Sequence, residues 1–357
     1  MEDAAGRLSQ FTRHEPYMRR ALRLAAKAMG QTSPNPLVGA VLVKAGRIIA
    51  EGCHRQAGAA HAEVEALRQA GARARGATLY VTLEPCNHHG RTPPCCDAII
   101  AAGISRVVTA TRDPNPLTNE RGLARLRRAG LRVVNGVLED EAQALIEPFR
   151  KAMVTGMPLV IAKIGQSLDG KIATRRGESR WITSSAARRL AHQWRSRVDA
   201  LLVGINTVRR DDPLLTARVG VRRPGRPIKV ILDSRLRIPL SAQCLSSESP
   251  ALTLVATTNH ADAKKRSALA RCGAEVLTLP ARQGRVPLRP LCRLLARRGI
   301  HSVLIEGGGE VLAGVLNDDE ESVHEGRPSA RQRARPLNVF RGRPPSWPFA
   351  RAARAFW

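Results

Sequence analysis

The stretch from residue 61 to residue 110, HAEVEALRQAGARARGATLYVTLEPCNHHGRTPPCCDAIIAAGISRVVTA, decides the fold class. Its first part, residues 61–71, predicts a helix, and residues 77–83 predict a short, apolar, buried strand. The same pair then repeats, with a helix over 95–103 and a strand over 105–110. This alternation of helices and strands predicts an α/β layer fold.

A further helix is predicted before this stretch. Residues 15–29, EPYMRRALRLAAKAM, place Met18, Leu22, Ala25 and Met29 three or four positions apart. This spacing is typical of one buried helical face.

A hairpin is predicted between that helix and residue 61. The breaker SPNP at 33–36 is followed by the apolar, β-branched run LVGAVLV at 37–43 and then by RIIA at 47–50. A short Lys-Ala-Gly turn separates the two runs, which favours a pair of antiparallel strands.

The second half of the chain continues the alternation after a break. Residues 140–153 predict a helix, and Gly156 with Pro158 interrupts the pattern, so we expect a domain boundary near residue 150. The sequence therefore predicts a first domain over 1–150 and a second over 151–317. Strands are expected over 158–164, 199–205, 227–233, 251–257 and from residue 301, with a helix over 261–273.

Composition limits the cellular setting and the partners. The 357 residues include seven cysteines, an odd number, and three of them lie in one segment, which suits a reducing compartment and metal binding better than disulfides. The first ten residues do not resemble a secretory signal, and no apolar run reaches the roughly 18 residues that cross a bilayer. We therefore expect a cytoplasmic protein with no membrane partner.

The net charge of +28 raises the alternative of a polyanion-binding protein. The arginines are scattered along the whole chain among Ala, Gly and Pro, and aromatic residues are scarce. This distribution indicates compositional bias and disfavours a nucleic-acid partner.

Four residues of the opening stretch have the pattern of a catalytic metal site. His61, Cys86 and Cys95 supply one imidazole and two thiolates, which leaves one position of a tetrahedral zinc for water. Zinc lowers the pKa of that water, and Glu63 is placed to take its proton and to pass it to a leaving amine. His61 and Cys95 are both expected at helix starts, where the helix dipole favours thiolate and hydroxide.

The non-catalytic alternative is a structural zinc site or a set of buried cysteines that pack as apolar residues. A structural site needs a fourth protein ligand, for which His88, His89 and Cys96 are the candidates. We expect His88 and His89 to line a loop above the pocket and Cys96 to pack behind it, because Glu63 is otherwise unexplained.

The motifs SPNPLVGAVLV, HAE, TLEPCNHHGRTPPCCDAII and DPNP, between residues 15 and 150, resemble the bifunctional riboflavin-biosynthesis deaminase/reductase family. Zinc nucleobase deaminases carry H-x-E…P-C-x-x-C. Here eight residues separate the two cysteines, as in the deaminase half of that family. The resemblance implies a cytidine-deaminase-like, three-layer domain with one Zn²⁺ per chain. It also implies hydrolytic deamination of a phosphorylated diaminopyrimidine ribosylamine.

The same resemblance implies the residues that bind this substrate. They are Asn35, His54, Arg91, Asp113 and Asn115. Asn and Asp match the donors and acceptors of a pyrimidinone edge, while Arg and His suit a phosphate. Asn35 and Asn115 lie beside prolines, so a turn-forming role competes with substrate binding at both positions.

Residues 161–183 and 206–218 are similar to the reductase half of this family, which implies a dihydrofolate-reductase-like fold and NADPH as cofactor. The implied cofactor contacts are Gly165, Trp181, Thr207, Asp211, Ser234, Gly308, Glu310, Val311, Leu312, Ala313, Gly314 and Gly309. The implied substrate contacts are Ser179, Arg195, Leu215, Arg218 and Glu306.

Physical reasoning leaves alternatives open in this half. No G-x-G-x-x-G is present, but glycines between a strand and a helix, as in LIEGGGEVLAG at 304–314, offer backbone N–H groups to a pyrophosphate or simply form a turn. Arg195 falls on a basic helical stretch that is equally compatible with a solvated face. Trp181 is more often a core residue than a cofactor contact.

The C-terminal residues break the pattern. Family members continue past the Gly-rich segment with two strands that complete the reductase sheet, whereas residues 318–357 are rich in Arg and Pro and contain no extended apolar run. We expect an atypical, loosely associated tail and a reductase domain that is incomplete at its C-terminal end. Deaminase activity should survive, while reductase stability or activity is reduced.

Two rival functions share parts of this pattern. An RNA- or nucleobase-editing zinc deaminase would use the same chemistry, but it normally has the shorter cysteine spacing and has no use for a fused reductase. A non-catalytic polyanion-binding zinc protein would explain the charge but not Glu63. The leading interpretation is a zinc- and NADPH-dependent bifunctional enzyme of riboflavin biosynthesis that acts on a small phosphorylated pyrimidine and is open to homo-oligomer formation.

Overall fold

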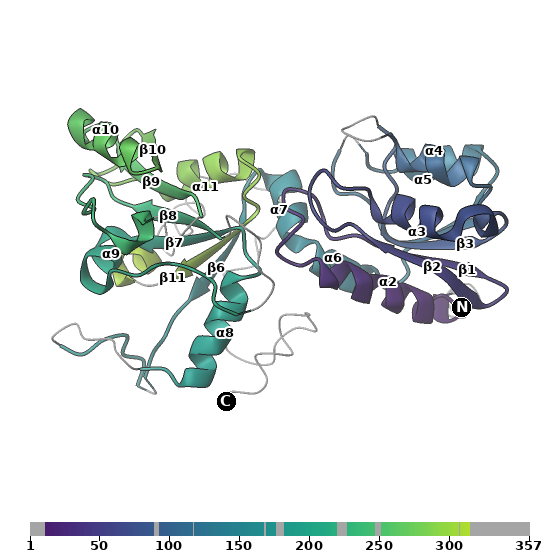
Figure 1. The fold of residues 1–357 in the computed structure, drawn as a ribbon, viewed down its shortest axis with the longest axis horizontal. Helices are drawn as coiled ribbons and strands as arrows, with labels where there is room; N and C mark the ends of the chain where they lie inside the picture. The colour runs from purple at the N-terminus through teal and green to yellow at the C-terminus, as the bar shows by residue number, and fades with distance from the viewer. Residues whose placement is uncertain are drawn as a thin grey trace, which may run out of the picture. The chain divides into compact units, whose positions relative to one another are not determined.

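The computed structural model describes residues 11–88, 93–116, 118–167, 169–175, 182–219, 227–246, 251–306 and 308–314. The chain divides into two compact units between Thr155 and Gly156 (Figure 1). None of the helices in these ranges combines the length and the apolar character that crossing a bilayer requires.

The first unit is built on a five-stranded sheet with the order β2-β1-β3-β4-β5. The hairpin strands β1 and β2 are antiparallel, β1 is antiparallel to β3, and β3, β4 and β5 run parallel. The strands are β1 (Gly39–Lys44), β2 (Arg47–Cys53), β3 (Thr78–Leu83), β4 (Arg106–Thr111) and β5 (Arg132–Asn135).

Helices cover both faces of this sheet, so the unit has three layers (Figure 1). Successive residues of β1 show why: Leu42 packs with α3, α4 and α5 on one face, while Val41 packs with α2 and α6 on the other. The helices are α2 (Glu15–Lys27), α3 (Ala62–Ala70), η1 (Gly71–Ala74), α4 (Cys95–Ala101), α5 (Arg121–Arg128), α6 (Glu139–Leu145) and α7 (Glu147–Thr155). The predicted three-layer α/β architecture is confirmed.

The predicted hairpin is also confirmed. Ala45 and Gly46 connect β1 to β2, and both have positive φ angles, of 49° and 73°. A two-residue turn with positive φ at both positions matches the twist of the flanking strands, and glycine adopts it at no steric cost.

The single helix predicted over 140–153 was wrong, because two helices, α6 and α7, occupy this region and meet at Ile146. Pro148 explains the break. Its ring would clash with the carbonyl group four residues earlier, and it has no N–H to donate, so the sequence does not continue α6 through this point.

The second unit contains a six-stranded parallel sheet with the order β10-β9-β8-β7-β11-β6. Its strands are β6 (Leu159–Lys163), β7 (Ala200–Gly204), β8 (Ile228–Leu232), β9 (Thr253–Thr258), β10 (Ala274–Leu279) and β11 (Ser302–Glu306). Its helices are α8 (Ser185–Arg195), α9 (Ile205–Asp211), η2 (Gln243–Leu245), α10 (Ala263–Arg271) and α11 (Leu288–Arg297).

Both faces of this sheet are also buried. Leu201 of β7 packs with Trp194 of α8 and Leu269 of α10, whereas the next residue, Leu202, packs with Leu291 of α11. Parallel strands that are covered on both faces have continuous apolar sequences, which is why their positions were predictable. Residues 318–357, predicted to form an atypical tail, lie outside the described residues.

A glycine of β2 allows close packing of the helix that carries the candidate acid. A Cβ atom at Gly52 would lie 2.1 Å from the carbonyl oxygen of Ala62 and 2.7 Å from the nitrogen of Ala66, both in α3. We expect Gly52→Ala to displace α3 and to lower the free energy of unfolding of the first unit by about 3 kcal/mol, measured by urea denaturation. Ala45→Gly, at a position with positive φ, is the control and should leave stability unchanged or slightly raised.

Candidate functional site

The three predicted metal ligands converge at one end of the first sheet. His61 directly precedes α3, Cys86 follows β3, and Cys95 is the first residue of α4. The His61 Nδ1 atom lies 3.1 Å from the Cys95 sulfur and 3.6 Å from the Cys86 sulfur. All three ligand atoms lie within 4.8 Å of one another.

These separations fit one zinc ion. Tetrahedral bonds of about 2.1 Å to nitrogen and about 2.3 Å to sulfur place neighbouring ligand atoms roughly 3.5–3.8 Å apart. Within the described ranges no fourth His, Cys, Asp or Glu joins the cluster. Cys96, one candidate for a fourth ligand, points its sulfur at the carbonyl groups of Pro85 and Gly122 instead, and His89 lies outside the described residues.

The two thiols share a proton. A hydrogen bond between the side chains of Cys86 and Cys95 lowers the pKa of Cys86 to about 4, and His61 lowers it further. The same bond raises the pKa of Cys95. The site thus presents a thiolate and a histidine at neutral pH, and a thiolate is the form that binds metal.

Glu63 lies beside this cluster in the first turn of α3. Its side chain is buried, with 3% exposed, and burial raises its pKa to about 6, against the opposing effect of His61. A carboxyl group with a pKa near neutrality can both accept and donate a proton under working conditions.

Asn35 and His54 are brought next to the cluster. The His54 ring lies edge-on to the His61 ring, with centroids 5.5 Å apart. Its Nδ1 atom is 3.1 Å from the carbonyl oxygen of Ala60, and its Nε2 atom is 3.0 Å from the Asn35 side-chain nitrogen. Burial lowers the pKa of His54, which favours the neutral ring.

Asp113 and Asn115 form a turn after β4. The Asn115 N–H donates to the Asp113 carboxylate over 2.9 Å, which is the Asx-turn expected for this residue type. Burial raises the pKa of Asp113 to about 6. The Thr118 hydroxyl lies 3.4 Å from His88 Nδ1, and Arg91 lies outside the described residues.

Two residues that sequence reasoning missed connect these segments. Glu84, which follows β3, is buried and accepts backbone N–H groups around the start of α5. Arg125 of α5 donates to Asn87 over 2.7 Å and forms an ion pair with Asp97. A charged residue in a basic, amphipathic stretch gives no local sign of such long-range contacts.

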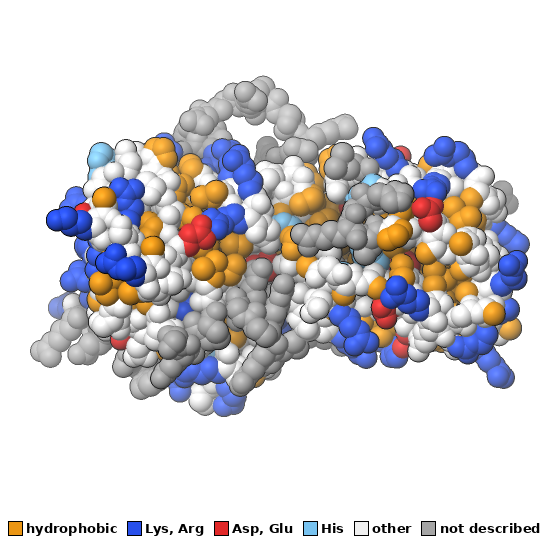
Figure 2. Space-filling model, turned by 45° about the horizontal axis from the view of Figure 1, so that its top comes forward, with side chains coloured by type: hydrophobic (Ala, Val, Ile, Leu, Met, Phe, Trp, Pro, Cys, Tyr) orange, Lys and Arg blue, Asp and Glu red, His pale blue; other side chains and the backbone are white. Residues whose placement is uncertain are grey.

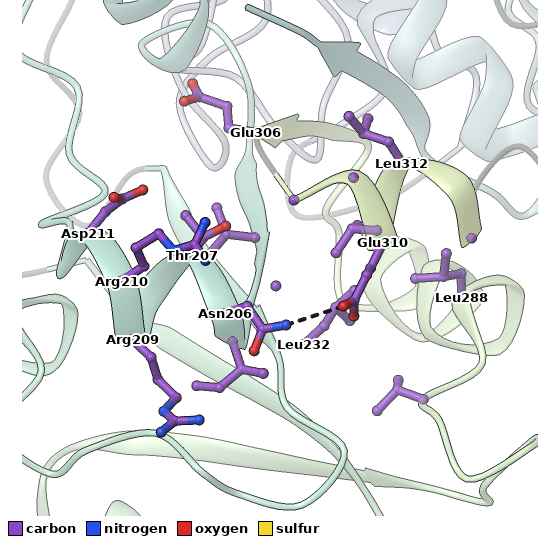
Figure 3. A pocket seen from close by; sticks show the side chains of 18 of the residues that line it. Asn206, Thr207, Arg209, Arg210, Asp211, Leu232, Leu288, Glu306, Glu310 and Leu312 are labelled. Carbon is purple, nitrogen blue, oxygen red and sulfur yellow. Dashed lines mark hydrogen bonds between the residues drawn. The ribbon is translucent and has the colours of Figure 1, made fainter. Parts of the chain in front are cut away.

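The second unit has a cavity of about 1350 Å³. It opens at the carboxyl ends of β6, β7, β8 and β11, the edge where parallel α/β sheets bind ligands. The predicted residues that line it are Gly165, Thr207, Asp211, Ser234, Gly308, Gly309, Glu310, Val311, Leu312, Gly314, Arg195, Leu215 and Glu306. In Figure 3, Glu306 lies at the upper end of this pocket and Arg209 at the lower end.

Some predicted residues lie elsewhere. Ala313 is absent from the lining of this cavity, and Arg218 lines a smaller adjoining pocket that shares Arg195 and Leu215. Ser179 and Trp181 lie outside the described residues. The cavity also has arginines that sequence reasoning did not single out, because arginine is spread over the whole chain: Arg209, Arg210, Arg235, Arg237, Arg282 and Arg285.

Glu306 and Arg195 form the most constrained pair of this pocket. The guanidinium donates to both carboxylate oxygens, over 2.8 Å and 2.6 Å, and Lys163 Nζ is 3.9 Å away. Burial opposes ionisation of Glu306, but the hydrogen bonds and charge of Arg195 outweigh it and lower the pKa below its ordinary value. Glu306 is therefore a buried carboxylate at neutral pH.

On one face of the molecule the positive charge is dispersed. On the face shown in Figure 2, Lys and Arg side chains are separated by apolar, acidic and other groups. A polyanion site requires cations clustered on one face, and this view shows no such cluster among the described residues.

Family models match both units. The cytidine and deoxycytidylate deaminase zinc-binding region matches residues 11–111, which contain the candidate metal ligands. The RibD C-terminal domain matches residues 158–319, which contain the cavity. The fold and the sites thus define a bifunctional enzyme in which a zinc-dependent deaminase domain is joined to an NADPH-dependent reductase domain.

Comparison with individual relatives shows to which family within this class the chain belongs. The riboflavin biosynthesis protein RibD of Aquifex aeolicus is 48% identical over 302 residues, covering 85% of this chain and 83% of the relative. RibD of Escherichia coli is 44% identical over 313 residues, with coverages of 85% and 83%. This chain belongs to the RibD family of riboflavin biosynthesis enzymes.

Solved structures of similar proteins have the same fold. Acinetobacter baumannii RibD, form 1, superimposes with a TM-score of 0.78 at 42% identity and covers 87% of this chain and 84% of that one. A diaminohydroxyphosphoribosylaminopyrimidine deaminase/5-amino-6-(5-phosphoribosylamino)uracil reductase from Thermotoga maritima gives a TM-score of 0.76 at 40% identity, with coverages of 87% and 85%. The predicted deaminase-like and reductase-like folds are confirmed.

The contacts of Arg125 predict an effect on zinc affinity. Arg125 joins Asn87, next to the candidate ligand Cys86, to Asp97, two residues after the candidate ligand Cys95. Arg125→Gln should weaken zinc binding about 10- to 100-fold, the usual effect of losing a contact that orients metal ligands. Competition with a chromophoric chelator measures this affinity. The control Arg127→Gln removes the same charge from an exposed position of α5 and should change the affinity less than twofold.

Proposed function

We propose that the first domain, residues 1–150, deaminates diaminohydroxyphosphoribosylaminopyrimidine, the substrate class that the Thermotoga relative's name states. The observation that carries this proposal is the convergence of His61, Cys86 and Cys95 beside the buried Glu63. These residues would hold a zinc ion, which would act as a Lewis acid and lower the pKa of the attacking water. Glu63 accepts the proton of that water and delivers it to the leaving amine, which departs as ammonia.

The geometry around His54 supports a role of Asn35 in recognising the pyrimidine. Because a carbonyl oxygen only accepts, His54 Nδ1 must donate to Ala60, and the Nε2 atom of the neutral ring must then be an acceptor. The Asn35 NH₂ group donates to this acceptor, so its carbonyl oxygen is left for an N–H donor of the substrate. Asp113, Asn115 and Arg91 complete the proposed contacts.

We propose that the second domain, residues 151–317, uses NADPH to reduce the ribosyl side chain of the deaminated product to ribityl. The cavity of about 1350 Å³ at the carboxyl edge of the sheet has room for a dinucleotide and a second ligand. The cofactor is assigned to the predicted contacts that line it, from Gly165 and Thr207 to the segment 308–314, and Trp181 belongs to the same proposal.

The substrate end of this cavity is assigned to the region around Glu306. The ionised Glu306 accepts hydrogen bonds from sugar hydroxyls, and Arg195, which already holds this carboxylate, also donates to the carbonyl group of Thr216. Leu215 lines the same cavity, Arg218 the adjoining one, and Ser179 is the remaining proposed contact.

A cytoplasmic location and a homo-oligomer are part of the proposal. None of the seven cysteines forms a disulfide, which suits a reducing compartment. In the described part of the chain β6 pairs only with β11, and we propose that a second copy associates at its other edge. Light scattering after size-exclusion chromatography tests the oligomer.

The rival functions have less support. An editing deaminase would have no use for the cavity of the second domain. The deaminase model and the RibD C-terminal model match successive parts of the chain, in the order deaminase then reductase. The overall test is to incubate the purified protein with the diaminopyrimidine phosphate, to follow ammonia release with and without a chelator, and then to follow NADPH consumption. Binding of RNA that falls steeply with salt, without ammonia release, would contradict the proposal.

Glu63→Gln tests the deaminase assignment. The amide cannot carry the proton, so kcat for ammonia release should fall about 10²- to 10⁴-fold while the zinc content is unchanged. In the native enzyme the rate should fall at acid pH, because protonated Glu63 is no longer a base. Glu65→Gln, on the same helix, is the control and should retain activity within twofold. Equal ammonia release by both variants would contradict the role of Glu63.

Glu306→Gln tests the reductase assignment. The neutral amide removes the negative charge opposite Arg195 and replaces one of the two acceptor oxygens by an NH₂ donor. It also removes an acceptor for the sugar, so kcat/KM for NADPH oxidation should fall at least about tenfold. Ammonia release should be unaffected. Glu275→Gln removes an acid from the partly exposed pair with Arg298 and should leave both rates unchanged. Unchanged NADPH oxidation in Glu306→Gln would assign the sugar contact to another group.

A further inference from the structure

Glu84 has an unusual set of hydrogen bonds. It directly follows β3, is only 3% exposed, and accepts four backbone N–H groups that lie 29 to 39 residues further along the chain. One carboxylate oxygen accepts from Asp113, over 3.3 Å, and from Glu120, over 3.0 Å. The other accepts from Gly122, over 3.0 Å, and from Leu123, over 3.2 Å.

These bonds complete the start of α5. The first N–H groups of a helix have no partner within the helix, and a side chain of the preceding residue usually caps them. Glu120, the residue before α5, has a φ of 62° and makes no such cap. The Arg121 N–H is bonded to Thr118, and Glu84 supplies the acceptor for the next two.

The backbone of Glu84 is also fixed, close in sequence to the candidate zinc site. The Glu84 N–H donates to Thr111 at the end of β4, and Cys86, a candidate ligand, is two residues further on. A Cβ atom at Gly122 would lie 2.0 Å from the carbonyl oxygen of Pro85, so α5 lies directly against the segment that carries Cys86. Movement of either segment would therefore break bonds to Glu84.

We infer that Glu84 is a positioning residue of the deaminase, which holds the turn containing Asp113 and Asn115 at a set distance from the zinc ligands. It does not belong to the metal cluster and acts through the residues that it orients. The inference rests on the proposed function, in which the Asp113 turn contacts the pyrimidine. Four N–H groups require four acceptor lone pairs, and a carboxylate is the side chain that offers them without a donor.

Glu84→Gln tests this role in the full-length, zinc-loaded enzyme. The amide keeps one acceptor oxygen and turns an NH₂ group toward two N–H donors, so the turn should shift while the fold is kept. We expect KM for the diaminopyrimidine phosphate to rise at least about tenfold, with about one zinc per chain retained and NADPH oxidation unchanged. The control Glu120→Gln removes the same charge from an exposed side chain of the same turn and should keep KM within twofold.

A lower melting temperature of Glu84→Gln with an unchanged KM would overturn the inference and leave a structural role alone. If this variant does not fold, Glu84→Asp decides, because it keeps the charge but shortens the reach. A raised KM in Glu84→Asp supports the inference, and an unchanged KM overturns it.

Hydrogen exchange of the native protein provides a test that needs no variant. The N–H groups of Glu120 and Gly122 should exchange as slowly as those of β3 if Glu84 holds them, and rapid exchange would overturn the inference. This measurement also separates the inference from the proposed function. An enzyme that releases no ammonia from the diaminopyrimidine phosphate contradicts the function but leaves the protection of these N–H groups unaffected.

Discussion

The deaminase half depends on three ligand-bearing segments meeting at one edge of a sheet. His61 and Cys95 both stand at the start of a helix, and Cys86 follows a strand that the two helices flank. Helix starts are the positive ends of the backbone dipoles, so the two helices favour the thiolate and the ionised Glu63 that the chemistry requires. Close packing of α3 on β2 at Gly52 and the bonds of Glu84 keep these segments in register.

In the reductase half, too, the functional groups meet at one edge of a sheet. Its strands are all parallel, so their carboxyl ends gather at one edge, and the loops that follow them surround the cavity. Glu306 is the last residue of β11 and reaches Arg195 at the end of α8, which is distant in sequence but adjacent at this edge. Both halves thus obtain buried ionised groups from rigid elements, and the loops need only supply the remaining contacts.

The features that could be predicted from the sequence are those that depend on residues close together in the chain. The hairpin followed from its turn residues, the buried strands from continuous apolar runs, and the cluster of candidate metal ligands from the spacing of His61, Cys86 and Cys95. The break between α6 and α7 at Ile146 was not predicted, because the apolar spacing continues across Pro148. The strand β5 has only four residues and was not predicted, and β10, α5 and α11 were not predicted either. Glu84 and Arg125 act through contacts about thirty residues away, for which a single sequence holds no sign.

Two buried carboxyl groups of the first domain lower its free energy of unfolding at neutral pH. Burial raises the pKa of both Glu63 and Asp113 to about 6, above the values near 4 of an unfolded chain. Between pH of about 4 and 6 the folded state therefore binds protons that the unfolded state has released, and the free energy of unfolding falls as the pH rises through this window. At neutral pH both groups are ionised at a cost to stability. A divalent cation beside Glu63 favours the ionised form and offsets that cost, so the acid that the reaction needs and the metal that the ligands hold are coupled through the stability of one domain.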